Sequence, residues 1–148
     1  MNLIEACPLG IHDLCRTELD PAVNLPRFNM PLELGLFLGA RRYGSQRDKR
    51  CLVLDKEPYR FRLFISDISG QDVHSHENQV ETLIGRVRDF LRTVSPGPLP
   101  GGARIHHDFI EFEAEKGSIC TALDLVPADV TFTDFVYIVA YYLKGPAT

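Results

Sequence analysis

The stretch RCLVLDKE, residues Arg50–Glu57, carries the clearest strand signal in the chain. Within it, Cys51–Leu54 form an unbroken apolar run, which is typical of a strand buried on both faces of a parallel sheet. Parallel strands are joined by crossover connections, usually helices, so segments of helical pattern are expected on both sides of this run. The stretch therefore predicts an α/β fold.

Two further strands are predicted, one on each side of this run. Residues 9–14 are short and apolar, and residues 71–75 form a weaker β-type segment. Helical patterns separate the strands: an apolar helix from about 30 to 42, a short helix near 58–69 and an amphipathic helix over 78–94. This alternation indicates a parallel sheet of about three strands flanked by helices.

The stretch SPGPLPGGA, residues 95–103, interrupts this alternation. It contains three prolines and three glycines, which a continuous helix does not tolerate. Helices are expected beyond it, with Thr131 or Thr133 as the N-cap of the last one. Because so short a tail is too small for a core of its own, we predict an α/β domain over residues 1–95 and a helical extension, residues 103–148, packed on it.

Composition excludes several functional classes. The chain has 148 residues, of which 45% are hydrophobic and 24% charged, and this is enough for a domain with a core. Its formal net charge of −4 and its scattered basic residues argue against nucleic-acid binding. No run reaches the roughly 18 to 20 apolar residues of a membrane span, and the N-terminus does not resemble a signal peptide. We expect a cytoplasmic protein with no membrane partner and no cofactor.

The stretch FNMPLELGLFLGA, residues 28–40, predicts a helix that is apolar on nearly every side but keeps one carboxylate, Glu33, near its start. Asn29 is the expected N-cap, which would place Glu33 in the first turn, close to the positive end of the helix dipole. In one interpretation Glu33 only stabilises the helix start or pairs with an arginine. In the other, Glu33, Asp13 and the loop 15–28 line a crevice at the carboxyl ends of the strands, where open α/β sheets bind ligands.

The chain resembles a known pattern in this region. HDL at the end of a strand, the stretch RFNMPLELGLFLGARR and the strand CLVLD are similar to D-L/T, a loop, N-x-x-x-E-L-G-x-A-x-A and an apolar strand. That pattern is shared by nucleoside 2-deoxyribosyltransferase-like and TIR-like domains, and the similarity runs from about Ile4 to Val94. The resemblance implies a flavodoxin-like fold that acts on N-glycosidic bonds of nucleosides or nicotinamide dinucleotides.

By this resemblance, Glu33 falls on the catalytic glutamate and Asp13 on the acidic residue at the strand end. A carboxylate suits the reaction, because breaking a ribosyl C–N bond develops oxocarbenium character that a carboxylate stabilises or traps. The further residues expected to bind the nucleotide or nucleoside ligand flank the same crevice: Arg27, Asn29, Met30 and Tyr59.

One feature departs from the pattern. Domains of this type normally begin with a βαβ segment that has no counterpart here, so the expected fold is a partial, truncated flavodoxin-like sheet. The Gly10–Leu14 strand would then lack its usual neighbour and expose an apolar edge, which natural proteins cover. We therefore expect a homo-oligomer, or a partner protein that covers this edge.

Other motifs are weaker. His74 and His76 have a spacing that can bind metal, but no third ligand is identifiable, and histidines at the surface or at a strand end are the favoured interpretation. His107, Glu111 and Glu115 share a helix face that is interpreted as solvated. The cysteines show no C-x-x-C spacing and are expected to be reduced and mostly buried, with Cys15 a plain loop thiol rather than a nucleophile: Cys7, Cys15, Cys51 and Cys120.

Arg60 and Arg62, which follow the second strand with Tyr59, are interpreted either as phosphate contacts or as packing residues. Three function classes stay open: an enzyme that cleaves or transfers an N-glycosidic bond, a nucleotide-binding module without turnover, and a non-catalytic protein-interaction or oligomerisation domain. The favoured interpretation is a site for a nucleotide- or nucleoside-related ligand, and no metal ion is expected in it.

Overall fold

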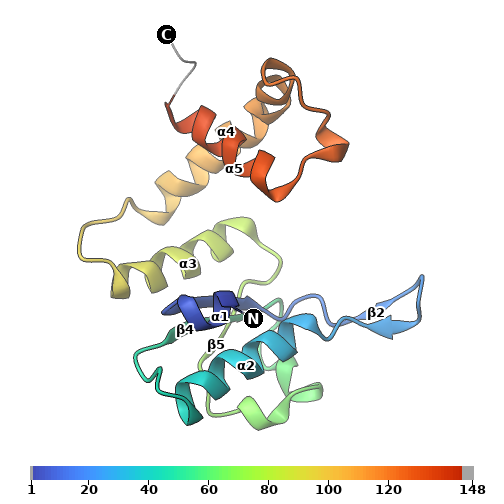
Figure 1. Cartoon of the computed structure of the whole chain (residues 1–148), viewed down its shortest axis with the longest axis vertical. Helices are drawn as coiled ribbons and strands as arrows, with labels where there is room; N and C mark the ends of the chain where they lie inside the picture. Colours follow the sequence, from blue (N-terminus) through green and yellow to red (C-terminus); the bar gives the residue numbers. More distant parts are fainter. Residues whose placement is uncertain (1, 145–148) are drawn as a thin grey trace. The chain divides into compact units, whose positions relative to one another are not determined.

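The computed structural model describes residues 2–144 (Figure 1). They form two compact units, which divide between Leu99 and Pro100 and which we describe separately. The first contains the sheet and the second is helical. Among the described residues, no helix combines the length and apolar composition that crossing a bilayer requires.

The first unit is built on a parallel sheet of three strands in the order β1-β4-β5. These strands are β1 (Leu9–Asp13), β4 (Arg50–Asp55) and β5 (Val73–Ser75). The central strand β4 supplies the most buried residues of the sheet, since Leu52, Val53 and Leu54 are at most 4% exposed. The predicted parallel sheet of three strands is therefore confirmed.

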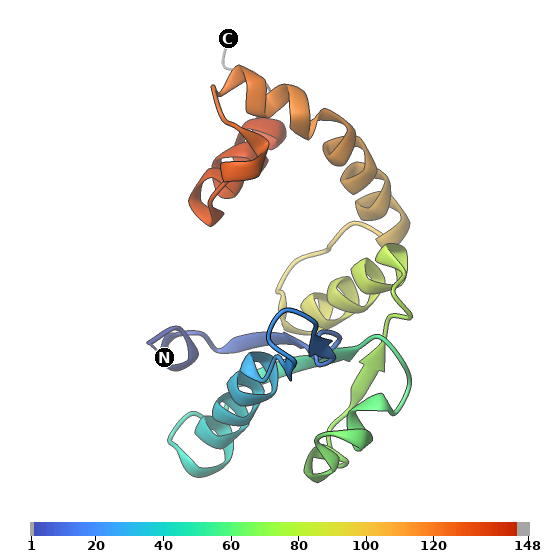
Figure 2. The same ribbon diagram turned by 90° about the vertical axis from the view of Figure 1, so that its right-hand side faces the viewer.

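Helices cover both faces of this sheet, with α2 and the 3₁₀ turns on one side and α3 on the other (Figure 2). One core cluster joins α2 and the 3₁₀ turns to the sheet, formed by Leu14, Leu34, Val53 and Phe61. The short helix predicted near 58–69 is wrong in type, because two separate 3₁₀ turns occupy this segment. The elements are α1 (Asn2–Ala6), α2 (Asn29–Tyr43), η1 (Arg60–Leu63), η2 (Ser66–Ile68) and α3 (Val80–Val94).

The start of α2 differs from its prediction. Asn29 is the first residue of the helix, not its N-cap, and the cap position is held by Phe28 with no side-chain hydrogen bond. Glu33 therefore lies beyond the first turn, which contains no acidic residue. Since the dipole effect fades beyond the first turn, stabilisation of the helix start is a weak reason for Glu33 to be there.

The loop 15–28 contains a small antiparallel ribbon, β2 (Leu19–Asp20) and β3 (Leu25–Pro26), which projects away from the sheet (Figure 1). Its turn is closed locally, because Asp20 Oδ1 accepts a hydrogen bond of 2.9 Å from the Ala22 N–H. Strands of two residues are too short to show an alternation of apolar and polar residues, so this ribbon could not be predicted from periodicity.

The edge of the sheet at β1 is open, as predicted. Within the described residues β1 pairs with β4 alone, which leaves the opposite side of β1 without a strand. Leu9 and Ile11 on this strand are 37% and 44% exposed. A strand edge without a partner, with exposed apolar side chains beside it, is a template for pairing with another chain.

The second unit is a helical hairpin of α4 (Gly102–Ala122) and α5 (Phe132–Lys144), joined through η3 (Pro127–Asp129). Thr131 and Asp134 cap α5 reciprocally: the Thr131 N–H donates to Asp134 Oδ2 at 2.9 Å, and the Asp134 N–H donates to Thr131 Oγ1 at 3.3 Å. This capping box selects Thr131 over Thr133 as the predicted N-cap. The expectation that this tail is too small for a core of its own is wrong, because the hairpin has a core cluster formed by Phe112, Ile119, Cys120 and Ile138.

All four cysteines are free thiols. The expectation that most are buried is wrong, because only Cys120 is fully buried, while Cys15 and Cys51 are partly exposed and Cys7 is exposed. Cys7 lies in the connection between α1 and β1.

Candidate ligand site at the carboxyl ends of the strands

The three parallel strands each end in polar residues at the same edge of the sheet. Asp13 ends β1, Asp55 ends β4, and Ser75 ends β5 with His76 directly after it. The ladder continues past the last strand residues, since the His76 N–H donates to the Asp55 carbonyl at 3.0 Å. The fold therefore gathers two carboxylates, a hydroxyl and an imidazole at one edge.

Asp55 is the anchor of this edge and is 0% exposed. Its Oδ1 accepts hydrogen bonds from the Lys56 N–H at 2.8 Å and the Arg60 Nε–H at 2.8 Å, and Arg60 Nη2 lies 2.7 Å from the same oxygen. A buried carboxylate requires such pairing, because an unpaired charge there would be very costly. Its other oxygen, Oδ2, is buried and has no hydrogen-bond partner among the described residues.

Arg60 ties Asp55 to the start of the loop 15–28. Its Nη2 donates to the Leu14 carbonyl at 2.6 Å and its Nη1 donates to Thr17 Oγ1 at 3.0 Å. With only 11% of its side chain exposed, Arg60 is a structural partner of Asp55 rather than a free phosphate contact. Lys56 holds the same loop through an ion pair with Glu18.

Asp13 makes a second group of contacts at this edge. Its Oδ1 accepts a hydrogen bond of 3.0 Å from the Cys15 N–H and lies 3.4 Å from His76 Nε2. His76 Nδ1 accepts a hydrogen bond of 3.2 Å from the Asn78 N–H, so the neutral ring carries its proton on Nε2, toward Asp13. The distance from His76 Nε2 to Asp13 Oδ1 is longer than that of an ordinary hydrogen bond, and Nε2 has no other partner among the described residues.

The ligand atoms of Asp13, Cys15 and His76 all lie within 4.8 Å of one another, which is the spacing of a metal site. Burial, followed by the hydrogen bond and charge of Asp13, raises the pKa of the Cys15 thiol to about 11. A thiol with this pKa is a poor nucleophile at neutral pH.

Glu33 lies apart from this cluster. It is exposed, and within the described chain its carboxylate makes no hydrogen bond or ion pair. Its electrostatic neighbour is His12, whose pKa is lowered by burial and raised by Glu33 to a smaller extent. Adjacent strand residues point to opposite faces, so Asp13 and His12 face different sides of the sheet. The structure therefore does not bring the carboxylates of Glu33 and Asp13 together.

His12 is unusual in its own right. It is 6% exposed, its ring meets Phe37 edge-on with centroids 5.2 Å apart, and neither ring nitrogen has a hydrogen-bond partner among the described residues. Gly10 makes room for it, because a Cβ at that position would lie 2.8 Å from His12 Nε2. The ring therefore sits under α2 as a neutral, solvent-shielded group.

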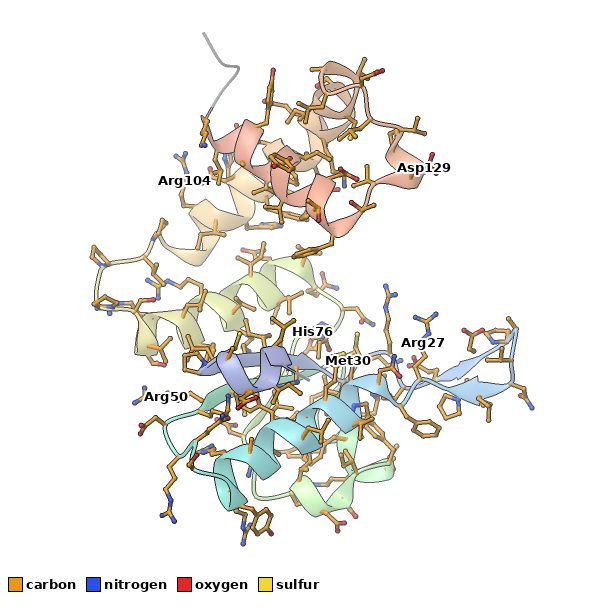
Figure 3. All side chains as sticks on the ribbon, in the orientation of Figure 1. Arg27, Met30, Arg50, His76, Arg104 and Asp129 are labelled. Atoms are coloured by element: carbon orange, nitrogen blue, oxygen red, sulfur yellow. The ribbon has the colours of Figure 1, made fainter. Side chains whose placement is uncertain are left out.

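The four predicted ligand residues flank the strand ends in different ways. Figure 3 shows Arg27, Met30 and His76 toward the end of the first unit from which the β2–β3 ribbon projects. Arg27 Nη2 lies 3.6 Å from Asp20 Oδ2, Asn29 is exposed, and Met30 packs against the core cluster. Tyr59 is 67% exposed, adopts a left-handed φ of 61°, and stacks with the Arg62 guanidinium at 4.7 Å.

His74 and His76 have different partners, whereas His107 and Glu111 lie together with Asp108 in a group whose ligand atoms are within 4.8 Å of one another. His74 Nε2 lies 3.2 Å from Asp72 Oδ2, whereas His76 faces Asp13. On α4, His107 lies 3.6 Å from Glu111 and 3.7 Å from Asp108, and Glu115 is not part of that group. The exposure of His107 and Glu111 agrees with the predicted solvated face.

Asp55 and Arg60 are the site residues whose roles sequence reasoning missed. The signal was present, because Asp55 ends an apolar strand in the same way that Asp13 does. No family model, no curated protein and no solved structure matches the chain. The resemblance to deoxyribosyltransferase-like and TIR-like domains stays a prediction.

Proposed function

We propose that the first unit binds a nucleoside or nucleotide at the carboxyl ends of its parallel strands. The observation that carries this proposal is Asp55, a fully buried carboxylate fixed by Arg60 with one oxygen unpaired, at the edge where all three strands end. Ligands of open α/β sheets bind at this edge, outside the carboxyl ends of the strands. A rigid buried anchor there favours a binding site over a solvated loop cluster.

The chemistry around this edge suits a sugar with a charged group attached. The exposed Glu33 offers carboxylate oxygens, which accept hydrogen bonds from ribose hydroxyls. Arg27, whose side chain is 65% exposed, offers a cation for a phosphate. The exposed ring of Tyr59 offers an aromatic face on which a base stacks.

Within this proposal, Glu33 is the residue that acts on an N-glycosidic bond. In that reaction the bond between the sugar carbon and the base nitrogen breaks, the base leaves with the bonding pair and takes up a proton, and water or a second base adds to the sugar carbon. Support comes from the exposed, unpaired state of Glu33 within the described chain, since an attacking carboxylate must approach the sugar closely. Asp13, which faces the other side of the sheet and is already engaged by His76 and Cys15, holds the strand end and takes no part in this step.

The test uses Glu33→Gln, with Glu81→Gln as the matched control. Both glutamates are exposed residues in the N-terminal half of 15-residue helices. The wild-type chain is incubated with NAD, NADP and a nucleoside panel, free base is measured by chromatography, and binding is measured by thermal shift. We expect Glu33→Gln to abolish base release or weaken binding with little loss of Tm, while Glu81→Gln behaves as wild type.

A wild type that neither releases base from any of these compounds nor is stabilised by them would contradict the proposal. The open edge of β1 specifically favours a second candidate, which then takes first place: a protein-interaction or oligomerisation domain.

A further inference from the structure

A polar groove lies near the opposite end of the sheet from the proposed ligand site. Its volume is about 630 Å³, and it runs between the last turn of α2 and the segment that leads from η2 into β5. Both elements lie on the same side of the sheet (Figure 2). The residues that line it and that matter here are Arg41, Arg42, Arg47, Asp67 and Gln71.

The groove concentrates positive charge in a chain whose net charge is −4. Three of its lining residues are arginines, and Asp67 is the one carboxylate among the eight residues that line it. Within the described chain, none of the three arginines forms an ion pair or donates a hydrogen bond. By contrast, Arg60 and Arg104 elsewhere are each paired with an aspartate.

Helix stabilisation explains only part of this arrangement. Arg41 and Arg42 occupy the last turn of α2, where cations interact favourably with the helix dipole. Arg47 lies beyond the helix, in the connection to β4, and gains nothing from that dipole. Arg42 also stacks over the Tyr43 ring, 5.7 Å from its centroid. A third guanidinium at the same groove adds like-charge repulsion, which an anionic ligand would relieve.

We propose that this groove binds a small anion that carries two or more phosphate groups. Guanidinium groups match phosphate oxygens bidentately, and three of them around one groove favour a multivalent anion over a single charge. The volume falls within the roughly 300 to 1,000 Å³ range of small-molecule sites, and the amide of Gln71 adds neutral donors. This site is separate from the proposed nucleoside site and does not depend on it.

Isothermal titration with pyrophosphate and tripolyphosphate tests the proposal, on the full chain and at constant ionic strength. The variant Arg41→Gln/Arg47→Gln should lower the affinity by about tenfold or more, because each lost charge-assisted contact costs a sizeable fraction of binding. Arg92→Gln is the matched control, since Arg92 is an exposed arginine in the last turn of another 15-residue helix. It should change the affinity by less than about twofold.

Asp67→Asn provides a gain-of-binding variant that misfolding cannot imitate. Removing the one lining carboxylate should tighten pyrophosphate binding several-fold. Citrate and orthophosphate distinguish phosphate chemistry from general anion attraction, and both should bind more weakly than pyrophosphate. The proposal is overturned if pyrophosphate does not bind, if citrate binds equally well, or if Arg92→Gln weakens binding as much as the double variant.

Discussion

Asp55 and Arg60 illustrate how single residues hold the candidate site together. Their contact is almost fully shielded, and Arg60 spends its remaining donors on Leu14 and Thr17, so one side chain fixes two strand ends and a loop. Removing one partner of a buried pair leaves an uncompensated charge. The stability of the first unit should therefore depend strongly on this contact.

Arg60→Met should lower the free energy of unfolding by about 3 to 5 kcal/mol. Arg27→Met is the control, because Arg27 and Asp20 form an exposed pair at 3.6 Å, and such pairs contribute about 0 to 1 kcal/mol. Urea denaturation followed by circular dichroism measures both. Equal losses in the two variants would show that the Asp55 contact is not the anchor described here.

His12 gives the first unit a pH dependence. Burial lowers its pKa below the ordinary value of 6.5, and the charge of Glu33 opposes this only in part. The unfolded chain therefore binds the proton more readily, so the contribution of neutral His12 is fully present above pH 6.5 and is lost as the pH falls below it. His12→Leu should flatten the decline of stability between pH 7.5 and 5.5.

The same measurement on Glu33→Gln should show a steeper decline, because the charge that raises the His12 pKa is removed. His74→Leu serves as the control and should keep the wild-type profile of stability against pH. Identical profiles for wild type and His12→Leu would rule out His12 as the source.

At the scale of elements, apolar runs predicted the buried strand β4 correctly, whereas the shortest elements could not be predicted from the pattern of residues. The run Cys51–Leu54 predicted β4 because a strand buried on both faces consists of consecutive apolar residues. The 3₁₀ turns near 58–69 and the β2–β3 ribbon were missed, since elements of two to four residues are set by tertiary contacts rather than by periodicity.

For the candidate site, the sequence predicted the position but not the contacts between side chains. Its position followed from the strand ends, and Asp13 was identified there. The pairing of Asp55 with Arg60 and the separation of Asp13 from Glu33 depend on which face each side chain takes, and a shift of one residue reverses that choice. The predicted N-cap of α2, Asn29, is wrong because Phe28 takes the cap position without any side-chain hydrogen bond, and such a cap has no signature in the sequence.

The capping box of α5 is testable by a pair of neighbouring substitutions. Thr131→Ala removes Oγ1, which accepts the Asp134 N–H, whereas Thr133→Ala changes an exposed residue inside the helix. Thermal melts should show a lower Tm for Thr131→Ala and almost no change for Thr133→Ala. A larger loss of Tm for Thr133→Ala than for Thr131→Ala would show that Thr131 is not the N-cap of α5.

At the scale of the whole molecule, the open edge of β1 predicts self-association. Strand pairing between two copies would cover Leu9 and Ile11. Light scattering at micromolar concentration should give a mass above the 16.7 kDa of one chain. The variant Ile11→Glu should lower the measured mass to that of a single chain. Leu63→Glu, at a site 85% exposed on η1, should leave the assembly intact.

A clean monomer for the wild type would contradict this expectation and would leave the edge of β1 simply solvated. It would leave the proposed ligand site untouched, since every contact of Asp13, Asp55 and His76 described above lies within one chain.

The proposed nucleoside or nucleotide site is tested most directly by a ¹H–¹⁵N NMR titration of the full chain with NAD and with a nucleoside panel. We predict that the amide signals of Asp13, Asp55 and His76, at the three strand ends, shift in a saturable way with at least one of these compounds. We also predict that Glu33→Gln weakens that response while Glu81→Gln does not. Amide signals at the strand ends that stay unchanged at saturating concentrations of every compound would contradict the account.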